Sequence, residues 1–303
     1  MIISKIQGGL GNQLFQYAIG RNLAIKNQTD LGFDLSFFQY NSLDANRQYL
    51  LEKFNISGRP LSELELKKIK NSNFAGRNLT ARIISKIIRT ITSLTPIKYR
   101  DFVAFNDIIF HPAVLKIKSK NNVYLAGNWP TEKYFLEISD TIKKDFTLKN
   151  EFSEASINIL KNIEESENAF SLHVRRGDYV QNEKTRNLHG NICTLLYYQQ
   201  ATNLIERQIK QPTYFIFSDD MPWVKENLKL NYPVVYVSDQ GIPDYEELIL
   251  MSKCQHNIIA NSTFSWWGAW LNNNPNKIVV APKKWFNADT DIKDLLPDNW
   301  IKI

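Results

Sequence analysis

The second half of the chain alternates between short apolar runs and helical stretches, and this pattern limits the fold more than any other feature of the sequence. Five runs are short, apolar and partly β-branched, as buried parallel strands are: 169–174, 214–217, 234–237, 256–260 and 277–281. Apolar residues at helical spacing fill the intervals 193–210, 243–253 and 264–273. Regular alternation of strand and helix predicts a doubly wound α/β domain with a parallel sheet.

The first half opens on the same plan, with a predicted strand at 2–6, the glycine-rich turn GGLGNQ and a helix. The turn is not a Walker loop, and it matches the dinucleotide-binding pattern only in part because Leu14 occupies the third glycine position. Gly9 and Gly11 would let the backbone approach a ligand closely, with Asn12 and Gln13 at the helix start. The helix is expected to turn these residues inward: Leu14, Tyr17, Ala18, Leu23 and Ile25.

Length, cysteines and charge narrow the class of protein. The 303 residues suffice for two domains, and the charged stretch KNIEESEN is the expected junction, which gives domains 1–165 and 166–303. The two cysteines have neither disulfide-framework nor zinc spacing. No leader-like core opens the chain and no apolar run approaches the ~20 residues of a membrane span, so we expect a soluble, cytoplasmic protein.

The net charge of +6 favours an anionic ligand. The lysines are scattered, however, and no nucleic-acid-binding signature accompanies them, so a phosphorylated small molecule is the preferred partner and nucleic acid is not expected. The sequence gives no indication of oligomeric state.

The strand 169–174 runs directly into the polar segment HVRRGDY. Strand alternation places Ser171, His173 and Arg175 on one face, and ligands of open α/β sheets bind beyond the carboxyl ends of strands. A guanidinium there offers bidentate hydrogen bonds to phosphate, so Arg175 is the predicted diphosphate clamp. The alternative is that Arg175 and Arg176 merely pair with Asp178 at the surface.

Two further polar clusters follow predicted strands. Ser262 and Thr263 stand where a helix begins, so their hydroxyls and the free backbone N–H groups could cradle phosphate, although a plain helix cap is the commoner use. Asp219 and Asp220 could bind a metal or accept from the N1–H and N2 amine of guanine, and the residues alone leave both uses open. The three tryptophans that follow are more often core than a stacking platform: Trp266, Trp267 and Trp270.

Four ordered motifs, GGLGNQLFQYA, HVRRGDY, FSDD and NSTFSWWGAWL, resemble those of the α-1,2-fucosyltransferases of glycosyltransferase family 11. WPTEKYF at 129–135 is similar to a further family stretch, with Pro130 where glutamine is expected. The resemblance implies a GT-B-like fold of two Rossmann-like domains facing a cleft. It also implies inverting, metal-independent transfer of L-fucose from GDP-fucose, without a cofactor, to the 2-hydroxyl of a galactose-terminated acceptor such as a bacterial O-antigen or capsule glycan.

By the same resemblance, which extends to α-1,6- and protein O-fucosyltransferases, residues acquire expected roles. His173 would touch guanine and Arg175 the β-phosphate, while Asp219, or Asp220 in its place, would hold the guanine edge. The diphosphate would be contacted by Ser262, Thr263 and Ser265. Asn12 would lie near the reacting centre.

The general base stays open at this stage. Asp178 could take the acceptor proton, Arg176 could instead hold Asp178 as a structural partner, or the leaving phosphate could accept the proton. Asp289-Thr290-Asp291 resembles an acidic metal motif but is read as solvated surface. The basic amphipathic helix predicted at 77–94 is more simply a cover for a core than a peripheral contact with an anionic membrane.

Two rival functions remain. One is another GDP-sugar transfer by the same fold, with a different linkage or acceptor. The other is a non-catalytic nucleotide- or glycan-binding protein, in which the tryptophan-rich segment would be a sugar platform.

Overall fold

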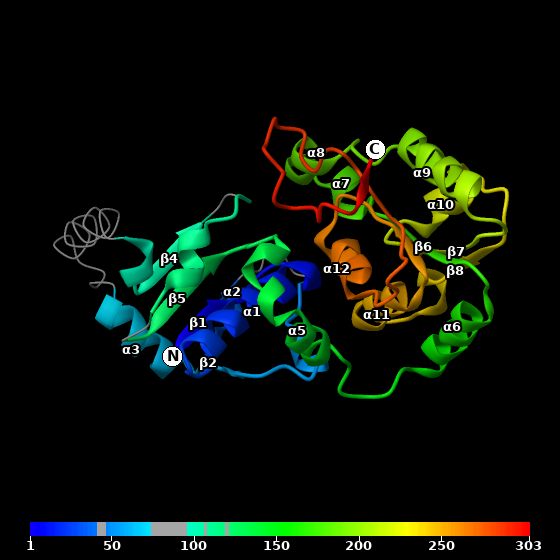
Figure 1. Cartoon of the computed structure of the whole chain (residues 1–303). Helices are drawn as coiled ribbons and strands as arrows, with labels where there is room; N and C mark the ends of the chain where they lie inside the picture. The colour runs from blue at the N-terminus through cyan, green and yellow to red at the C-terminus, as the bar shows by residue number, and fades with distance from the viewer. Residues whose placement is uncertain (41–46, 74–95, 106–107, 119–120) are drawn as a thin grey trace. The chain divides into compact units, whose positions relative to one another are not determined.

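A computed structural model describes residues 1–40, 47–73, 96–105, 108–118 and 121–303. The chain forms two compact units, Met1–Thr147 and Leu148–Ile303 (Figure 1). The division lies before helix α6 (Glu154–Glu165), whereas the sequence analysis placed the junction after residue 165. The predicted amphipathic helix at 77–94 lies outside the described residues, so the structure does not address it.

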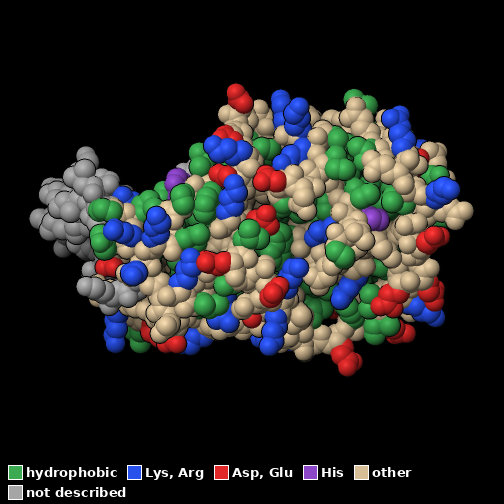
Figure 2. Space-filling model, in the orientation of Figure 1, with side chains coloured by type: hydrophobic (Ala, Val, Ile, Leu, Met, Phe, Trp, Pro, Cys, Tyr) green, Lys and Arg blue, Asp and Glu red, His purple; other side chains and the backbone are tan. Residues whose placement is uncertain are grey.

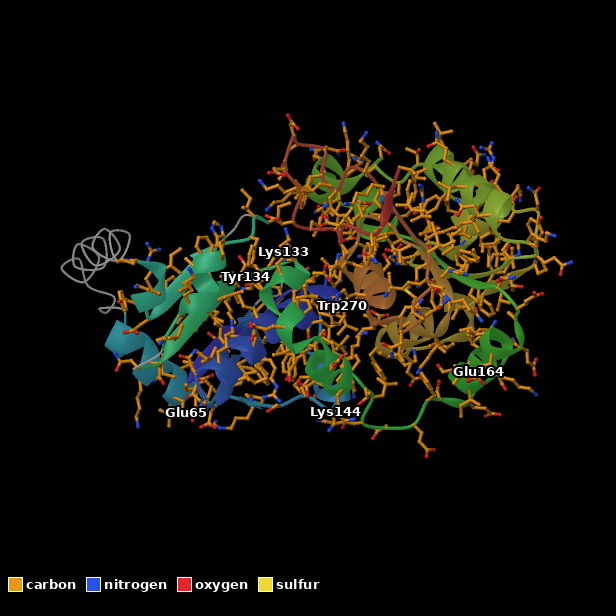
Figure 3. The ribbon with its side chains drawn as sticks, in the orientation of Figure 1. Glu65, Lys133, Tyr134, Lys144, Glu164 and Trp270 are labelled. Carbon is orange, nitrogen blue, oxygen red and sulfur yellow. The ribbon has the colours of Figure 1, made fainter. Side chains whose placement is uncertain are left out.

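The first unit is built on a five-stranded parallel sheet in the order β3-β2-β1-β5-β4. Its strands are β1 (Ile2–Lys5), β2 (Leu31–Asp34), β3 (Arg59–Pro60), β4 (Phe102–Phe105) and β5 (Val123–Gly127). Its helices are α1 (Leu10–Lys26), α2 (Ser36–Tyr40), α3 (Glu63–Asn73) and α5 (Ser139–Asp145). Short 3-10 turns include η4 (Pro112–Lys116), η5 (Glu132–Tyr134) and η6 (Leu136–Ile138). Figure 3 labels Tyr134, the buried last residue of η5.

Helix α1 follows β1 through the glycine turn that the sequence predicted. Gly8 has a φ of 77°, a conformation that favours glycine, and Gly9 stands at the N-cap. Leu14, Tyr17, Ala18 and Leu23 are fully buried as expected. Ile25 was predicted to be buried but is 39% exposed, because it lies in the last turn of the helix, beyond the part that packs on the sheet.

The second unit contains a six-stranded parallel sheet in the order β11-β10-β9-β6-β7-β8. Its strands are β6 (Ala169–Val174), β7 (Thr213–Ser218), β8 (Val234–Tyr236), β9 (His256–Ile258), β10 (Val279–Ala281) and β11 (Ile301–Lys302). Its further helices are α7 (Gly177–Gln181), α8 (Glu183–His189), α9 (Leu195–Gln208), α10 (Met221–Asn227), α11 (Asp244–Lys253) and α12 (Thr263–Leu271). The predicted doubly wound α/β class is confirmed, and the chain reverses its direction of winding between β6 and β9.

Strand β6 separates two hydrophobic cores, as its alternation predicts. Phe170, Leu172 and Val174 pack with the apolar sides of α9 and α10. On the opposite face, Asn257 Nδ2 donates to Ser171 Oγ at 2.7 Å and to Met251 O on α11 at 2.9 Å. The face of β6 that carries Ser171 and His173 is therefore the face covered by α11 and α12.

Helix α12 buries its tryptophans. Trp266 and Trp267 have no exposed surface, and Trp270, labelled in Figure 3, is 7% exposed. Trp266 Nε1 donates to Leu295 O at 2.9 Å, and its ring also packs against Trp300. The expectation that these tryptophans form core is confirmed, so they do not offer a sugar platform.

The surface agrees with a scattered distribution of charge. Lys and Arg side chains are spread over the face drawn in Figure 2 and are interspersed with acidic ones. Among the described residues, no helix combines the length and the apolar character needed to cross a membrane.

Candidate functional site

The carboxyl ends of β6, β7 and β9 bring together the polar clusters that the sequence singled out. Arg175 follows β6, Asp219 follows β7, and Ser262 stands between β9 and α12. Strands β6 and β9 flank the point where the sheet changes direction, which is where open α/β sheets bind ligands.

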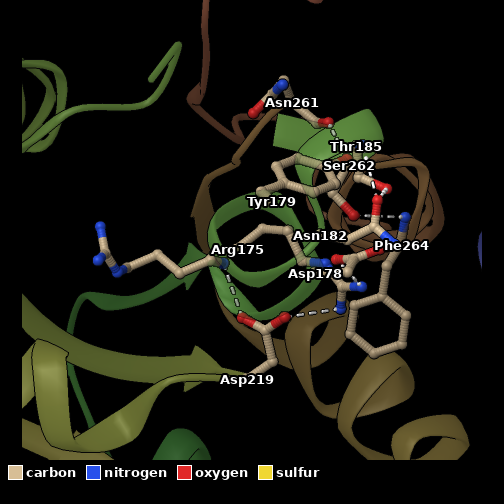
Figure 4. Close-up of polar contacts among 10 residues, drawn as sticks. Arg175, Asp178, Tyr179, Asn182, Thr185, Asp219, Asn261, Ser262 and Phe264 are labelled. Atoms are coloured by element: carbon tan, nitrogen blue, oxygen red, sulfur yellow. Dashed lines mark hydrogen bonds and ion pairs between the residues drawn. The ribbon is translucent and has the colours of Figure 1, made fainter. Parts of the chain in front are cut away.

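Arg175 is held by two carboxylates. Its Nη2 lies 2.6 Å from Asp178 Oδ1, and its Nη1 lies 3.0 Å from Asp219 Oδ2 (Figure 4). Burial alone would lower the pKa of Arg175, but the charges of Asp219 and Asp178 reverse this effect and raise the pKa above its ordinary value. Arg175 is therefore a fixed, permanent cation at the edge of the sheet.

Arg176 has a different role from its neighbour. Its backbone N–H donates to Asp219 Oδ1 at 2.8 Å, and its Nε donates to Asp220 Oδ2 at 3.1 Å. Its guanidinium also lies 3.9 Å from the ring centroid of Trp223, a cation–π contact that the sequence analysis missed. Asp178 pairs with Arg175, which the sequence analysis had given as the alternative to a diphosphate clamp.

Asp220 also caps a helix that the sequence analysis did not foresee. Its Oδ1 accepts from Trp223 N in the first turn of α10 at 3.3 Å. Both oxygens of Asp219 and both of Asp220 are thus engaged by donors from their own unit.

Gly177 makes room for Asp219. A Cβ at residue 177 would lie 2.6 Å from Asp219 Oδ2 and 3.1 Å from its Cγ, closer than atoms pack. Gly177→Ala should displace Asp219, loosen Arg175 and lower kcat roughly 10-fold, since small misplacements of a reacting group are costly. In an Asp219→Ala background the same change should have almost no further effect. An equal loss in both backgrounds would show that Gly177 acts by another route.

His173 is buried at the end of β6. It is 4% exposed, its carbonyl accepts from Tyr198 OH at 3.1 Å, and its ring lies 5.6 Å from that of Phe264 at the start of α12. Among the described residues its Nδ1 has no hydrogen-bond partner, which is uncommon for a buried polar atom. A buried nitrogen without a hydrogen-bond partner among the described residues suits a ligand contact.

The environment of His173 predicts a pH dependence of stability. Burial first, and Arg175 second, lower its pKa to about 3. The unfolded chain takes up this proton near pH 6.5, so the contribution of His173 to the free energy of unfolding is complete above pH 6.5 and declines as pH falls toward 3. Urea unfolding at pH 7.5 and 4.5 measures the free energies of unfolding of wild type and His173→Gln. Between the two pH values, wild type should lose about 2 kcal/mol more of this free energy than the variant loses. A difference that is the same at both pH values would mean that folded His173 titrates normally.

The start of α12 presents one accessible hydroxyl rather than three. Ser262 Oγ accepts from Phe264 N at 3.4 Å as the N-cap, and Ser265 Oγ donates to Ser262 O at 3.4 Å. Both serines are buried, whereas Thr263 is partly exposed. Asn261 fixes the approach to the helix, because its Nδ2 donates to the carbonyls of His189 and Trp285, each at 3.1 Å. Thr263 and the backbone amides of the first turn are the groups that could reach phosphate.

The predicted residues of the first unit form a separate cluster at the end of β1. Gly9 and Gly11 begin α1, and Asn12 is partly exposed beside them. A Cβ at Gly9 would lie 3.1 Å from Arg47 Nη1, so this arginine side chain covers the turn. Arg47 stands in a stretch without a recognisable motif, which is why the sequence did not single it out.

Two negative expectations can be compared with the structure. Asp289, Thr290 and Asp291 lie on the surface, and Asp291 pairs with Lys293 at 3.0 Å. Across the part of the chain that the structure describes, no three His, Cys, Asp or Glu side chains group as metal ligands.

Comparison with known proteins places these features in context. The model of the family described as glycosyl transferase family 11 matches residues 1–303. The chain is 34% identical to the O-antigen biosynthesis glycosyltransferase WbnK of Escherichia coli, over 99% of each chain. It is 30% identical to an Escherichia coli α-1,2-colitosyltransferase, over 100% of this chain and 99% of the relative.

More distant similarities were also found. The chain is 27% identical to the human galactoside α-(1,2)-fucosyltransferase 1, over 46% of this chain and 40% of the relative. Among solved structures, the fucosyltransferase NodZ from Bradyrhizobium is similar at 14% identity and a TM-score of 0.49, over 88% of this chain and 91% of that one.

Proposed function

Because this chain belongs to glycosyltransferase family 11, we propose that it transfers L-fucose from GDP-fucose to the 2-hydroxyl of a terminal β-galactoside. The observation that carries this proposal is the guanidinium of Arg175, which two carboxylates hold at the end of β6, beside the point where the sheet changes direction. The relatives named as galactoside α-(1,2)-fucosyltransferases support fucose as the transferred sugar and the linkage. We place the reaction in the cytoplasm, on a cell-surface glycan precursor, in keeping with the relative named for O-antigen biosynthesis.

The proposed reaction makes use of the charges at the site. The bond between fucose C1 and the β-phosphate oxygen breaks, a bond from C1 to the acceptor oxygen forms on the opposite face, and configuration inverts. Negative charge grows on the leaving GDP, so a cation placed there lowers the barrier. Arg175 would supply that charge, Thr263 and the amides of α12 would bind the diphosphate, and no metal or other cofactor is required by this scheme.

The proton of the acceptor hydroxyl has two available destinations in this proposal. Asp178 Oδ1 is bonded to Arg175, which supports a role in positioning the cation more than in accepting a proton. We therefore assign the proton to the departing phosphate. Asn12, in the first unit, is the proposed group for orienting the acceptor hydroxyl.

Asp178→Asn tests this assignment. The amide oxygen can still accept from Arg175, so we expect kcat to fall by less than about 10-fold and the pH profile of kcat to keep its shape, whereas Asp178→Ala should cost more. Steady-state rates from pH 5.5 to 8.5 provide the measurement. Near-complete inactivity of the asparagine variant, with loss of the acidic limb, would identify Asp178 as the base.

A second donor deserves testing because a relative of 30% identity over the whole chain is named α-1,2-colitosyltransferase. Colitosyl transfer would use the same linkage with a different sugar on the donor. Comparing kcat/KM for GDP-fucose and the corresponding colitose donor on one acceptor decides between the two.

The experiment that tests the proposed function is release of GDP from GDP-fucose with and without lactose, in EDTA. Turnover that depends on lactose and survives EDTA, with NMR showing fucose α-linked to the galactose 2-oxygen, supports the whole proposal. GDP binding without turnover on any β-galactoside would favour a different acceptor or the rival non-catalytic binding function. Absence of GDP binding would contradict the donor site itself.

A further inference from the structure

Glu247 is a buried carboxyl group close to the candidate site, and the sequence analysis treated it only as an acid in the first turn of a helix. It is 8% exposed and lies in that turn of α11, directly after the connection from β8. Its side chain is hydrogen-bonded to Ser238, whose Oγ accepts from the backbone N–H of Ser218 at 3.0 Å. Ser218 ends β7, so the Glu247 carboxyl lies at the carboxyl edge of the sheet, beside β7 and β8.

In the described part of the chain, no cation is among the causes that set the pKa of Glu247. Burial chiefly, and the negative charge of Asp244 on the same helix, raise its pKa to about 8 against the effect of the Ser238 hydrogen bond. Lys225 pairs with Asp239. Burying a carboxylate without a cation beside it is costly, and a buried acid with a strongly perturbed pKa is a candidate for binding a ligand.

The two acids that the resemblance assigned to guanine are already engaged. Asp219 Oδ1 accepts from the backbone of Arg176, and its Oδ2 pairs with Arg175. Asp220 caps α10 through one oxygen and pairs with Arg176 through the other. If either acid read the base, it would have to give up contacts that position the arginines.

We propose that Glu247 recognises the guanine of the donor, its carboxylate accepting from N1–H and from the N2 amine. This inference rests on the proposed function and adds the residue that selects the nucleobase. Two donors side by side match the two oxygens of one carboxylate, which is the pairing that distinguishes guanine from other bases.

The position of Glu247 suits a base rather than a phosphate. Strand β8 lies two strands from β6 in the sheet, roughly 10 Å away at the usual strand spacing. With the diphosphate at Arg175, the ribose would pass over β7 and the base would reach β8. His173 lies on the same face of the sheet, the face covered by α11 and α12, and its buried Nδ1 has no hydrogen-bond partner among the described residues.

Binding should also move a proton. At pH 7 the Glu247 carboxyl of the free protein is mostly protonated, so forming two hydrogen bonds from guanine to the carboxylate releases that proton to solvent.

The test compares GDP with inosine diphosphate, which lacks the N2 amine. Calorimetry measures the Kd values of both nucleotides for wild type, Glu247→Gln and the control Glu246→Gln. Glu246 is a suitable control because its carboxylate accepts hydrogen bonds from Ser153. We expect wild type and the control to prefer GDP about 10-fold or more, and the preference to fall to within about twofold in Glu247→Gln. An unchanged GDP preference in Glu247→Gln, or loss of the preference in Asp219→Asn alone, overturns the proposal.

Proton release gives a test that needs no variant. Titrating wild type with GDP at pH 7 in buffers of different ionisation enthalpy should show release of close to one proton, and a release near zero overturns the carboxylate form of the contact. These results can distinguish an error in the role of Glu247 from an error in the proposed function. Lactose-dependent turnover of GDP-fucose, together with an unchanged preference of Glu247→Gln for GDP over inosine diphosphate, would contradict only the role of Glu247. Lack of GDP binding by wild type would remove both.

Discussion

Arg175→Ala is expected to lower kcat by roughly 10²-fold or more while the protein remains folded. The guanidinium faces charge that grows on the leaving diphosphate only in the transition state, so its loss should reduce kcat as well as donor affinity. The two carboxylates left behind, Asp178 and Asp219, have side chains that are 33% and 26% exposed, so water can solvate them and folding should survive.

Arg175→Lys is the matched variant for this prediction. It keeps a positive charge but cannot contact Asp178 and Asp219 with separate nitrogens of a fixed fork, so we expect activity between those of wild type and Arg175→Ala. Single-turnover rates at saturating GDP-fucose, with circular dichroism as a check of folding, supply the comparison. Near-normal turnover of the alanine variant would remove Arg175 from the mechanism.

Trp266→Ala is expected to lower the free energy of unfolding by about 3–5 kcal/mol. The indole is completely buried, its Nε1 donates to Leu295 O at 2.9 Å, and it stacks on Trp270 with ring planes 10° apart. Alanine would leave a large cavity and a carbonyl without its donor.

Urea unfolding followed by circular dichroism measures this loss. Trp266→Phe should cost less, because it fills part of the cavity, and Trp223→Ala should cost less still, since Trp223 is only partly buried and packs against Arg176. Wild-type stability in Trp266→Ala, combined with loss of acceptor binding, would revive the platform interpretation of this segment.

The sequence was sufficient to predict the strands of the second unit and the face of the sheet on which His173 lies, because short apolar runs and period-two alternation are local signals. It was insufficient for α7, α8 and α10, because helices of 5, 7 and 7 residues are too short to show a clear helical period. The buried position expected of Ile25 was wrong because spacing along a helix does not reveal where the partner sheet ends.

The sequence likewise predicted only part of the candidate site. Motifs located Arg175, Asp219 and Ser262 at neighbouring strand ends, since strand order in a doubly wound sheet brings those ends together. They could not show that Asp219 pairs with Arg175, or that Glu247 is buried, because both facts depend on side chains from different elements. The need for glycine at residue 177 likewise could not be predicted, because it depends on the position of the Asp219 side chain.

The double ion pair of Arg175 has a consequence for turnover. Asp178 and Asp219 are tethered anions that remain paired with the guanidinium that meets the diphosphate, so they lower the net attraction between Arg175 and the nucleotide. After transfer the same two negative charges weaken the hold of Arg175 on GDP and favour its departure. An enzyme arranged in this way trades ground-state affinity for rapid product exchange, and its resting cation never faces the solvent without a counterion.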